Sequence, residues 1–257
     1  MKDGNKHLAL VANTAWNLHH FRGGLIRALQ AAGHRVTALA PPGSPTDAEA
    51  LQALGVRFLP LRHLSRKGAD PLQDLRLLRE LTRLYRSEQI DLALHYTVKP
   101  NIYGSLAARR AEVHSICTVT GLGYAFLHRG LLPRLVRLLY RFAFHRADRV
   151  LFQNPDDREL FLKLGLIHAE KAGLIPGSGI DIRHFYPRPY PEESPDAPFR
   201  FLFVGRLLYD KGVRELLEAV DILNRAGRNV HLELVGDIDT GNPASLSLED
   251  IQAWGQA

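Results

Sequence analysis

The first half of the chain alternates short apolar segments with longer segments of helical spacing, and this alternation restricts the fold more than any other feature. Six apolar segments are strand candidates: residues 7–12, 35–40, 56–61, 92–95, 115–119 and 149–153. Helical spacing is found in residues 21–32, in residues 48–54 after a cap at Thr46 or Asp47, and after Asp70-Pro71. The pattern predicts an α/β fold, a doubly wound parallel sheet with helices on both faces.

The helix that opens at Asp70-Pro71 is expected to bury one apolar stripe. Its members are Leu72, Leu75, Leu78, Leu81, Leu84 and Tyr85.

Ligands of such sheets bind at the carboxyl ends of the strands, where the strand order reverses. We therefore expect the site of the first domain among four loops: residues 13–24, 95–103 and 120–124, which follow expected strands, and residues 177–181, which end the pattern before the linker.

A proline-rich stretch, residues 187–198, separates this pattern from a second one. We expect a first domain at residues 1–186, a linker at 187–198 and a second domain at 199–257. In the second domain the pattern predicts a strand at 200–204, a helix at 213–224, a strand at 231–235 and a further helix at 247–254. Since one βαβ unit leaves much of its sheet uncovered, we expect this second domain to be incomplete.

The second domain begins with a strand, a short basic loop and a helix, residues 201–224. Gly205 ends the apolar run, and Arg206 and Lys211 lie five positions apart in the loop. Free backbone N–H groups at the helix start, with two cations beside them, suit a diphosphate. The alternative is an ordinary loop whose cations face water.

Composition favours anionic partners and a reducing compartment. The chain carries a formal net charge of +6, and its single cysteine, Cys117, lies in an apolar run, where we expect a buried thiol. We find no stretch long enough to span a bilayer and no signal sequence, so we expect a cytoplasmic protein or one peripheral to the inner membrane face. Twelve histidines occur without metal-ligand spacing, which argues against a zinc site.

Three of the loops carry polar or glycine residues that suit a ligand. Gly23 and Gly24 would let the backbone approach a ligand closely, or they form a tight turn into the helix. Without the G-x-G-x-x-G spacing, an NAD enzyme is disfavoured. Thr120 and Gly121 could form the floor of a sugar or phosphate site, or a turn. Gly179, with Asp181 close behind it, could offer backbone donors.

The loop after the fourth strand reads His95-Tyr96-Thr97-Val98-Lys99-Pro100-Asn101. His95 is placed for a polar contact or a proton transfer, and Lys99 could bring charge to the same cleft. The alternative is a histidine that bonds a neighbouring loop.

Residues 129–149 carry six arginines and one aspartate among leucines and phenylalanines. Such a basic amphipathic helix lies on an anionic membrane surface, or it is a core helix with a solvated arginine face. Nucleic acid is the weaker interpretation, because no recognised binding module or aromatic platform is found.

Several of these motifs together resemble the retaining glycosyltransferases of family 4, with the GT-B architecture of two facing Rossmann-like domains. They are residues 21–24 with 32–36, residues 176–181 with 185–187, and residues 204–207 with 210–212. Residues 95–101, 120–124, 236–239 and 242–244 resemble one branch, whose members add N-acetylgalactosamine or a related sugar to polyprenyl-diphosphate-linked saccharides in bacterial glycan assembly.

The resemblance implies a UDP-sugar donor whose diphosphate is held by Arg206 and Lys211, with Gly205 beside them. Fixed cations would replace a metal ion, so no cofactor and no metal is expected. Gly23 and Gly24 would approach the donor phosphates or the acceptor. His95 and Thr120 would act at the acceptor side of the cleft, where Lys99, Asn101, Gly121, Gly179 and Asp181 are also expected.

The chain departs from the family pattern at two places. Many members have a histidine after the fifth strand, where Thr120-Gly121 stands here. The family's E-x7-E motif lies downstream of the second domain's second strand, beyond Ala257. The alternatives are therefore a truncated, non-catalytic fragment that binds membrane or acceptor, and another GT-B enzyme such as a nucleotide-sugar epimerase.

Overall fold

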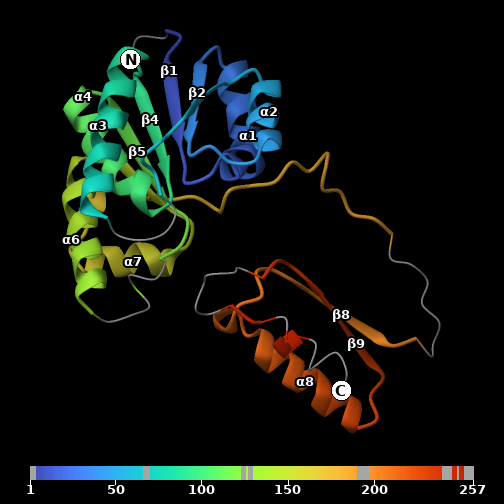
Figure 1. Ribbon diagram of the computed structural model, residues 1–257. Coiled ribbons are helices and arrows are strands. Elements are labelled where there is room, and N and C mark those ends of the chain that lie inside the picture. Colours follow the sequence, from blue (N-terminus) through green and yellow to red (C-terminus); the bar gives the residue numbers. More distant parts are fainter. Residues whose placement is uncertain are drawn as a thin grey trace. The chain divides into compact units, whose positions relative to one another are not determined.

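The computed structural model describes residues 4–65, 70–122, 126, 130–189, 197–238, 245–247 and 249–251. The chain forms two compact units, unit 1 (Met1–Tyr186) and unit 2 (Pro187–Ala257) (Figure 1). Several residues named above lie outside the described ranges: Gly123, Tyr124, Arg129, most of the linker (190–196), residues 242–244 and the end of the last expected helix (252–254).

Unit 1 is built on a seven-stranded sheet in the order β3-β2-β1-β4-β5-β6-β7. All neighbouring strands are parallel, which confirms the predicted doubly wound α/β fold. The strands are β1 (His7–Val11), β2 (Arg35–Ala40), β3 (Arg57–Pro60), β4 (Leu92–Tyr96), β5 (His114–Val119), β6 (Arg149–Phe152) and β7 (Ala172–Leu174). The short strand β7 was not predicted, because three residues that include a glycine carry no apolar run.

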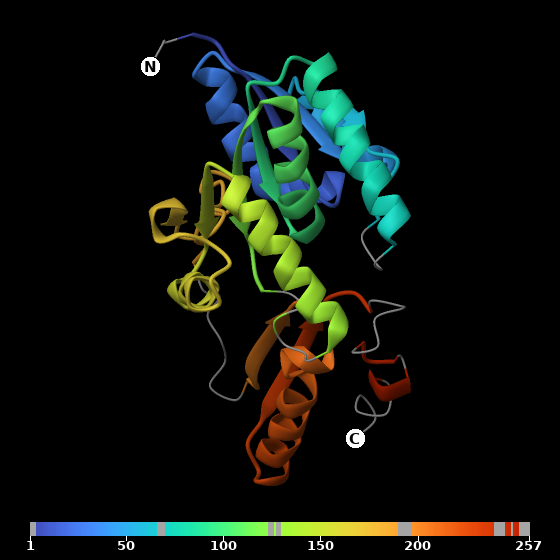
Figure 2. The ribbon, with the colours of Figure 1, turned by 90° about the vertical axis from the view of Figure 1, so that its left-hand side faces the viewer.

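Two layers of helices cover the sheet. On one face lie α1 (Ala15–Ala31) and α2 (Pro45–Ala53), and on the other lie α3 (Pro71–Ser87), α4 (Ser105–Ala111) and α6 (Leu131–Arg146) (Figure 2). Helix α7 (Pro155–Lys163) packs beside β6 and β7. Short turns complete the unit: a π-helical turn, η1 (Pro100–Gly104), and a 3-10 turn, η2 (Ala169–Lys171). Helix α2 is capped by Ser44 rather than by Thr46 or Asp47.

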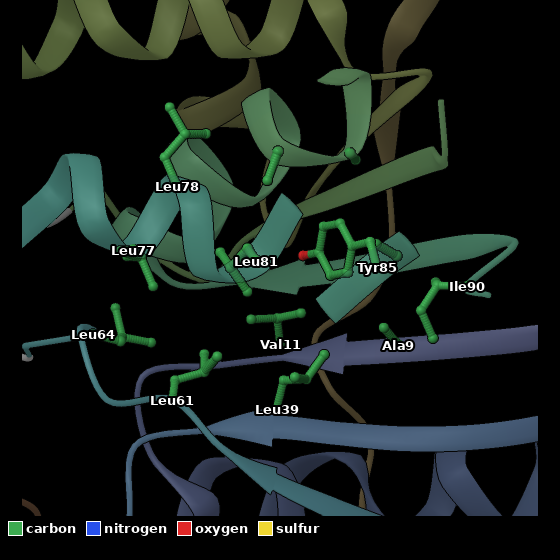
Figure 3. Close-up of a cluster of buried hydrophobic side chains, with 13 residues drawn as sticks. Ala9, Val11, Leu39, Leu61, Leu64, Leu77, Leu78, Leu81, Tyr85 and Ile90 are labelled. Atoms are coloured by element: carbon green, nitrogen blue, oxygen red, sulfur yellow. The ribbon is translucent and has the colours of Figure 1, made fainter. Parts of the chain in front are cut away.

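Alternate residues of β1 enter different cores, as the twofold period of a strand requires. Leu8 and Leu10 pack under α1 and α2. Ala9 and Val11 pack under α3, together with Leu77, Leu78, Leu81 and Tyr85 (Figure 3). The prediction for α3 was wrong at its first turn, where Leu72 and Leu75 are 68% and 39% exposed. The buried stripe is rotated toward Asp74 and Leu77.

Unit 2 contains one parallel strand pair in its described residues, β8 (Phe199–Val204) and β9 (Val230–Val235). A 3-10 turn, η3 (Tyr209–Lys211), and helix α8 (Val213–Arg225) connect the two strands. The sheet face toward α8 contributes Phe203 and Leu234 to a small core around Val213. Leu202 and Val204 alternate with these and are 63% and 71% exposed.

Candidate functional site

The strand order of unit 1 reverses between β1 and β4, which are parallel neighbours. Val11 is paired with His95 in this register, so the residues that follow the two strands start from the same edge of the sheet. Helix α1 follows β1, and the segment 97–101 follows β4. This edge is the crevice in which doubly wound sheets bind ligands, and we call it the switch-point edge.

Helix α1 begins six residues earlier than the sequence predicts. Thr14 caps it by accepting a hydrogen bond from the Asn17 amide at 3.0 Å. Gly23 and Gly24 therefore lie inside the helix and not in a loop before it, which corrects the prediction. Amides in a helix interior bond the carbonyls four residues earlier, so these two amides are not free for a phosphate. A side chain at Gly23 would meet Leu54 at 3.7 Å, and one at Gly24 would meet open space.

His95 is fully buried, and this corrects the expectation of a histidine that faces a cleft. Its Nε2 lies 2.8 Å from the Tyr85 hydroxyl of α3, and its Nδ1 lies 3.8 Å from the sulfur of Cys117. Burial lowers the pKa of His95 to about 3 and raises that of Cys117 to about 12, so both groups are neutral. A neutral core histidine touches no substrate here, and the buried Cys117 thiol is confirmed.

Lys99 and Asn101 also turn away from a cleft. Lys99 Nζ donates to Asp74 of α3 at 2.8 Å, and the second oxygen of Asp74 accepts from the Tyr103 hydroxyl at 2.7 Å. Asn101 is 1% exposed and donates to the Thr118 carbonyl at 2.9 Å. Lys99 thus ties the segment after β4 to α3, and Asn101 ties it to β5, so both side chains serve the packing of the unit.

Thr120 and Gly121 are exposed at the carboxyl end of β5, where a ligand could reach them. Gly121 has a φ of +146°, with no atom within 4 Å of the position a Cβ would take. Gly179 is exposed as well and has a φ of +72°.

Asp181 links the loop 177–181 to helix α1. It pairs with Arg183 at 3.2 Å and with Arg27 of α1 at 3.3 Å. The hydrogen bonds from Arg183, with the charge of Arg27 beside them, lower the pKa of Asp181. The carboxylate is therefore charged at neutral pH and holds the loop against the helix.

In unit 2, Gly205, Arg206 and Lys211 lie in the predicted strand–loop–helix at the carboxyl end of β8. Arg206 and Lys211 are exposed, and α8 starts after Gly212 without a side-chain cap. A Cβ at Gly236 would overlap the carbonyl oxygen of Gly205. The loops after β8 and β9 thus approach each other closely, which only glycine permits.

Sequence reasoning missed Arg22 as a site residue. Its guanidinium lies 4.0 Å from the centre of the Tyr96 ring, and the residue is only 4% exposed. Burial lowers the pKa of Arg22, yet a guanidinium stays charged at neutral pH. The signal was present in the sequence: Leu18, Arg22 and Ile26 follow the i, i+4 spacing of a buried stripe, and a cation stands in the middle of it.

Two surfaces on the α3, α4 and α6 side are strongly basic or amphipathic. Two adjoining hollows of about 570 and 370 Å³ are lined by arginines. Four of these belong to α3, namely Arg76, Arg79, Arg83 and Arg86, and the others are Arg62 and Arg110. Helix α6 exposes an apolar stripe of Leu131, Leu135, Leu138 and Phe142, with exposed Arg134 and Arg141 beside it. No described helix is long and apolar enough to cross a bilayer.

Residues 20–177 match the glycosyl transferase 4-like domain, and the chain belongs to this family. Over 156 residues it is 26% identical to the UDP-Gal:alpha-D-GlcNAc-diphosphoundecaprenol alpha-1,3-galactosyltransferase of Escherichia coli, a match that covers 58% of this chain and 40% of that protein.

Solved structures share the fold. A glycosyltransferase from Rickettsia africae and Anabaena Alr3699/HepE in complex with UDP-glucose each have a TM-score of 0.70 and 15% identity. Each match covers 98% of this chain, and it covers 64% of the Rickettsia chain and 66% of the Anabaena chain. The sucrose-phosphate synthase of Thermosynechococcus elongatus has a TM-score of 0.71 at 18% identity, over 98% of this chain and 67% of its own. The structural neighbours include GT-B glycosyltransferases, as the sequence predicts.

Proposed function

We propose that this protein transfers a hexose or N-acetylhexosamine from a UDP-sugar to a lipid-linked saccharide, with retention, in the assembly of a bacterial surface glycan or glycoprotein. The observation that carries the proposal is the family match over residues 20–177 together with the basic strand–loop–helix of unit 2. The E. coli relative, named for a UDP-sugar donor and a diphosphoundecaprenol acceptor, supports this choice of substrates.

Arg206 and Lys211 bind the donor diphosphate in this proposal. Both side chains are exposed at the carboxyl end of β8, next to the uncapped start of α8. Guanidinium and ammonium groups stabilise the negative charge that develops on the departing UDP. Fixed cations do the work of a metal ion, so transfer continues in excess chelator.

The acceptor binds at the carboxyl edge of unit 1. Thr120 and Gly121 were predicted there and are exposed, and the exposed Gly179 lies two residues after the end of the family match. The acceptor hydroxyl attacks from the face that UDP leaves, so retention needs no nucleophile from the protein. His95 has no direct part in this step, because it is buried.

Helix α6 holds the protein on the cytoplasmic face of an anionic membrane. Its exposed leucines and Phe142 enter the boundary of the lipid chains, and Arg134 and Arg141 contact the headgroups. A lipid-linked acceptor is reached most readily from that position.

The test is calorimetric titration of UDP into the wild type and into Arg206→Ala and Lys211→Ala variants. We expect each variant to lose roughly tenfold or more in affinity, since bonds between charged groups contribute about 1.5 to 3 kcal/mol. Arg200→Ala is the matched control, because Arg200 is exposed at the other end of β8. Equal UDP affinity in all four proteins would refute the assignment.

Two alternatives predict different results. A module that only binds acceptor or membrane would bind no UDP. A nucleotide-sugar epimerase would convert the free UDP-sugar without any acceptor, and epimerase structures do share the fold at a TM-score of 0.58. The family match and the E. coli relative favour the transferase.

A further inference from the structure

The switch-point edge holds a buried cation, Arg22, which pairs with no acidic side chain among the described residues. No described side chain forms a hydrogen bond or an ion pair with the Arg22 guanidinium, and its Nε is buried and unpaired. Among the described residues, the guanidinium stacks on the π face of Tyr96, with its central carbon 4.0 Å from the ring centre. Burying a polar atom without a hydrogen-bond partner is unfavourable, because the atom loses its hydration and gains nothing in return, and Arg22 Nε is such an atom.

Unpaired polar atoms gather in the two segments that leave this edge. Asn17 Oδ1, His19 Nδ1 and Arg22 Nε belong to the first half of α1, and Thr97 Oγ1 belongs to the segment after β4. Buried polar atoms of native proteins are almost always hydrogen-bonded, so such a group of exceptions requires an explanation.

The backbone at Thr97 is also unusual. Thr97 directly follows Tyr96, the residue under the Arg22 guanidinium, and has a φ of +71°. A β-branched residue rarely adopts this conformation, and such strain persists mostly where a ligand or a catalytic group uses it. Helix α1 adds its positive end to the same edge and has no acidic residue in its first turn.

We propose that Arg22, stacked on Tyr96 and flanked by Thr97, binds a phosphate or diphosphate ester at the switch-point edge of unit 1. The anion supplies the missing counter-charge, and the Thr97 hydroxyl completes its hydrogen bonds. The inference rests on the proposed function only for the origin of the ligand: the diphosphate of the lipid-linked acceptor or that of the nucleotide sugar. It moves the anion site of this unit from Gly23 and Gly24, whose amides lie inside a helix, to the arginine before them.

The test is calorimetric titration of inorganic pyrophosphate at neutral pH into wild type, Arg22→Met and Arg22→Lys. Methionine keeps an apolar stem on Tyr96 without the charge, and lysine keeps the charge without the planar fork. Arg79→Met on α3 is the matched control, because it removes the same charge from an exposed position.

We expect Arg22→Met to weaken pyrophosphate binding by about tenfold or more, Arg22→Lys to weaken it less, and Arg79→Met to leave it nearly unchanged. Equal affinities of wild type and Arg22→Met, or equal losses in Arg22→Met and Arg79→Met, would overturn the proposal. Titrations of UDP and of farnesyl diphosphate into the same proteins distinguish the nucleotide sugar from the lipid-linked acceptor. The compound whose affinity falls in Arg22→Met represents the ligand class that binds at this edge.

Thermal unfolding without ligand provides a second readout. Replacing an unpaired buried cation with an apolar side chain should leave the Tm unchanged or raise it. A much lower Tm of Arg22→Met would show that the guanidinium serves folding alone, against the proposal. If pyrophosphate binding depends on Arg22 while no UDP-sugar supports transfer, the proposed function fails and this site stands. If pyrophosphate binding is independent of Arg22 while sugar transfer occurs, the Arg22 site fails and the proposed function stands.

Discussion

The Tyr85 hydroxyl lies 2.8 Å from Nε2 of His95, between α3 and β4 in the core of unit 1. The two side chains are fully or almost fully buried, and Tyr85 belongs to the apolar cluster under α3 (Figure 3). This bond fixes a neutral histidine at the end of the central strand.

The stability of unit 1 should depend on pH through His95. The pKa of His95 is about 3 in the folded protein and 6.5 in the unfolded chain, so the unfolded state binds more protons between these values. The stabilisation is complete above pH 6.5 and is lost as the pH falls toward 3. Between pH 7.5 and 5.5 the loss from this residue is about 1.4 kcal/mol.

Urea unfolding of wild type and His95→Gln at these two pH values measures the difference. The variant should lose about 1.4 kcal/mol less than wild type over the interval, although His7 and His19, whose pKa values burial also lowers, titrate in both proteins. Identical losses would mean that His95 takes up protons equally in the folded and unfolded states, so that burial does not lower its pKa.

Two glycines of unit 1 should respond to alanine in opposite directions. Gly24→Ala should stabilise by about 0.5 to 1 kcal/mol, because Gly24 lies in a helix interior with open space around it. Gly104→Ala should destabilise by roughly 1 to 3 kcal/mol, since its Cβ would overlap the His95 ring.

Unfolding midpoints in urea test both signs, and UDP titration of Gly24→Ala tests the corrected role of this glycine. A Gly24→Ala protein that is more stable and binds UDP as wild type does agrees with the structure. A large loss of UDP affinity would instead support the contact between Gly24 and a phosphate that the sequence predicted.

The ion pair between Lys99 and Asp74 should contribute to stability as a unit. The two side chains are 16% and 10% exposed, so Lys99→Met leaves a nearly buried carboxylate whose remaining side-chain partner in the described part of the chain is the Tyr103 hydroxyl. We expect a loss of about 2 to 3 kcal/mol, most of which the double variant Lys99→Met/Asp74→Leu recovers.

A double-mutant cycle by urea unfolding measures this coupling. Losses that simply add in the double variant would show that the two charges do not depend on each other.

Binding to anionic vesicles should depend on α6. Removing Arg134 and Arg141 together, as glutamines, should weaken binding to phosphatidylglycerol vesicles by roughly thirtyfold, at about 1 kcal/mol per basic residue near the surface. Co-sedimentation measures the change. The control removes Arg214 and Arg225 from α8, where each is paired with an acid on the same helix. If both double variants weaken vesicle binding equally, the net charge of the protein and not α6 accounts for the binding.

The sequence predicted the architecture well because local patterns determine it. The apolar runs of β1, β2 and β4 and the cap at Asp70 are local signals, and the structure agrees with them. Side-chain direction is not local. His95 lies one residue before the end of β4, close to its predicted place, but its ring turns into the core. There it bonds Tyr85, which lies on a helix that packs across the strand.

The site was harder to predict than the fold for the same reason. Helix α1, capped by Thr14, begins six residues before its expected start, and this shift places Gly23 and Gly24 inside the helix. Arg22 stands on a buried stripe, which the spacing could have revealed, but its contact with Tyr96 depends on the pairing of β1 with β4.

The most direct test of the central claim is sugar transfer by the purified protein. Radiolabelled UDP-galactose, UDP-glucose, UDP-N-acetylglucosamine and UDP-N-acetylgalactosamine would each be incubated with polyprenyl-diphosphate-linked N-acetylhexosamine in excess chelator, and the label extracted into organic solvent. We expect label from at least one donor to enter the lipid fraction, and Arg206→Ala and Lys211→Ala to reduce this transfer strongly. Absence of label in the lipid fraction with every donor, in a protein that also fails to bind UDP, would contradict it.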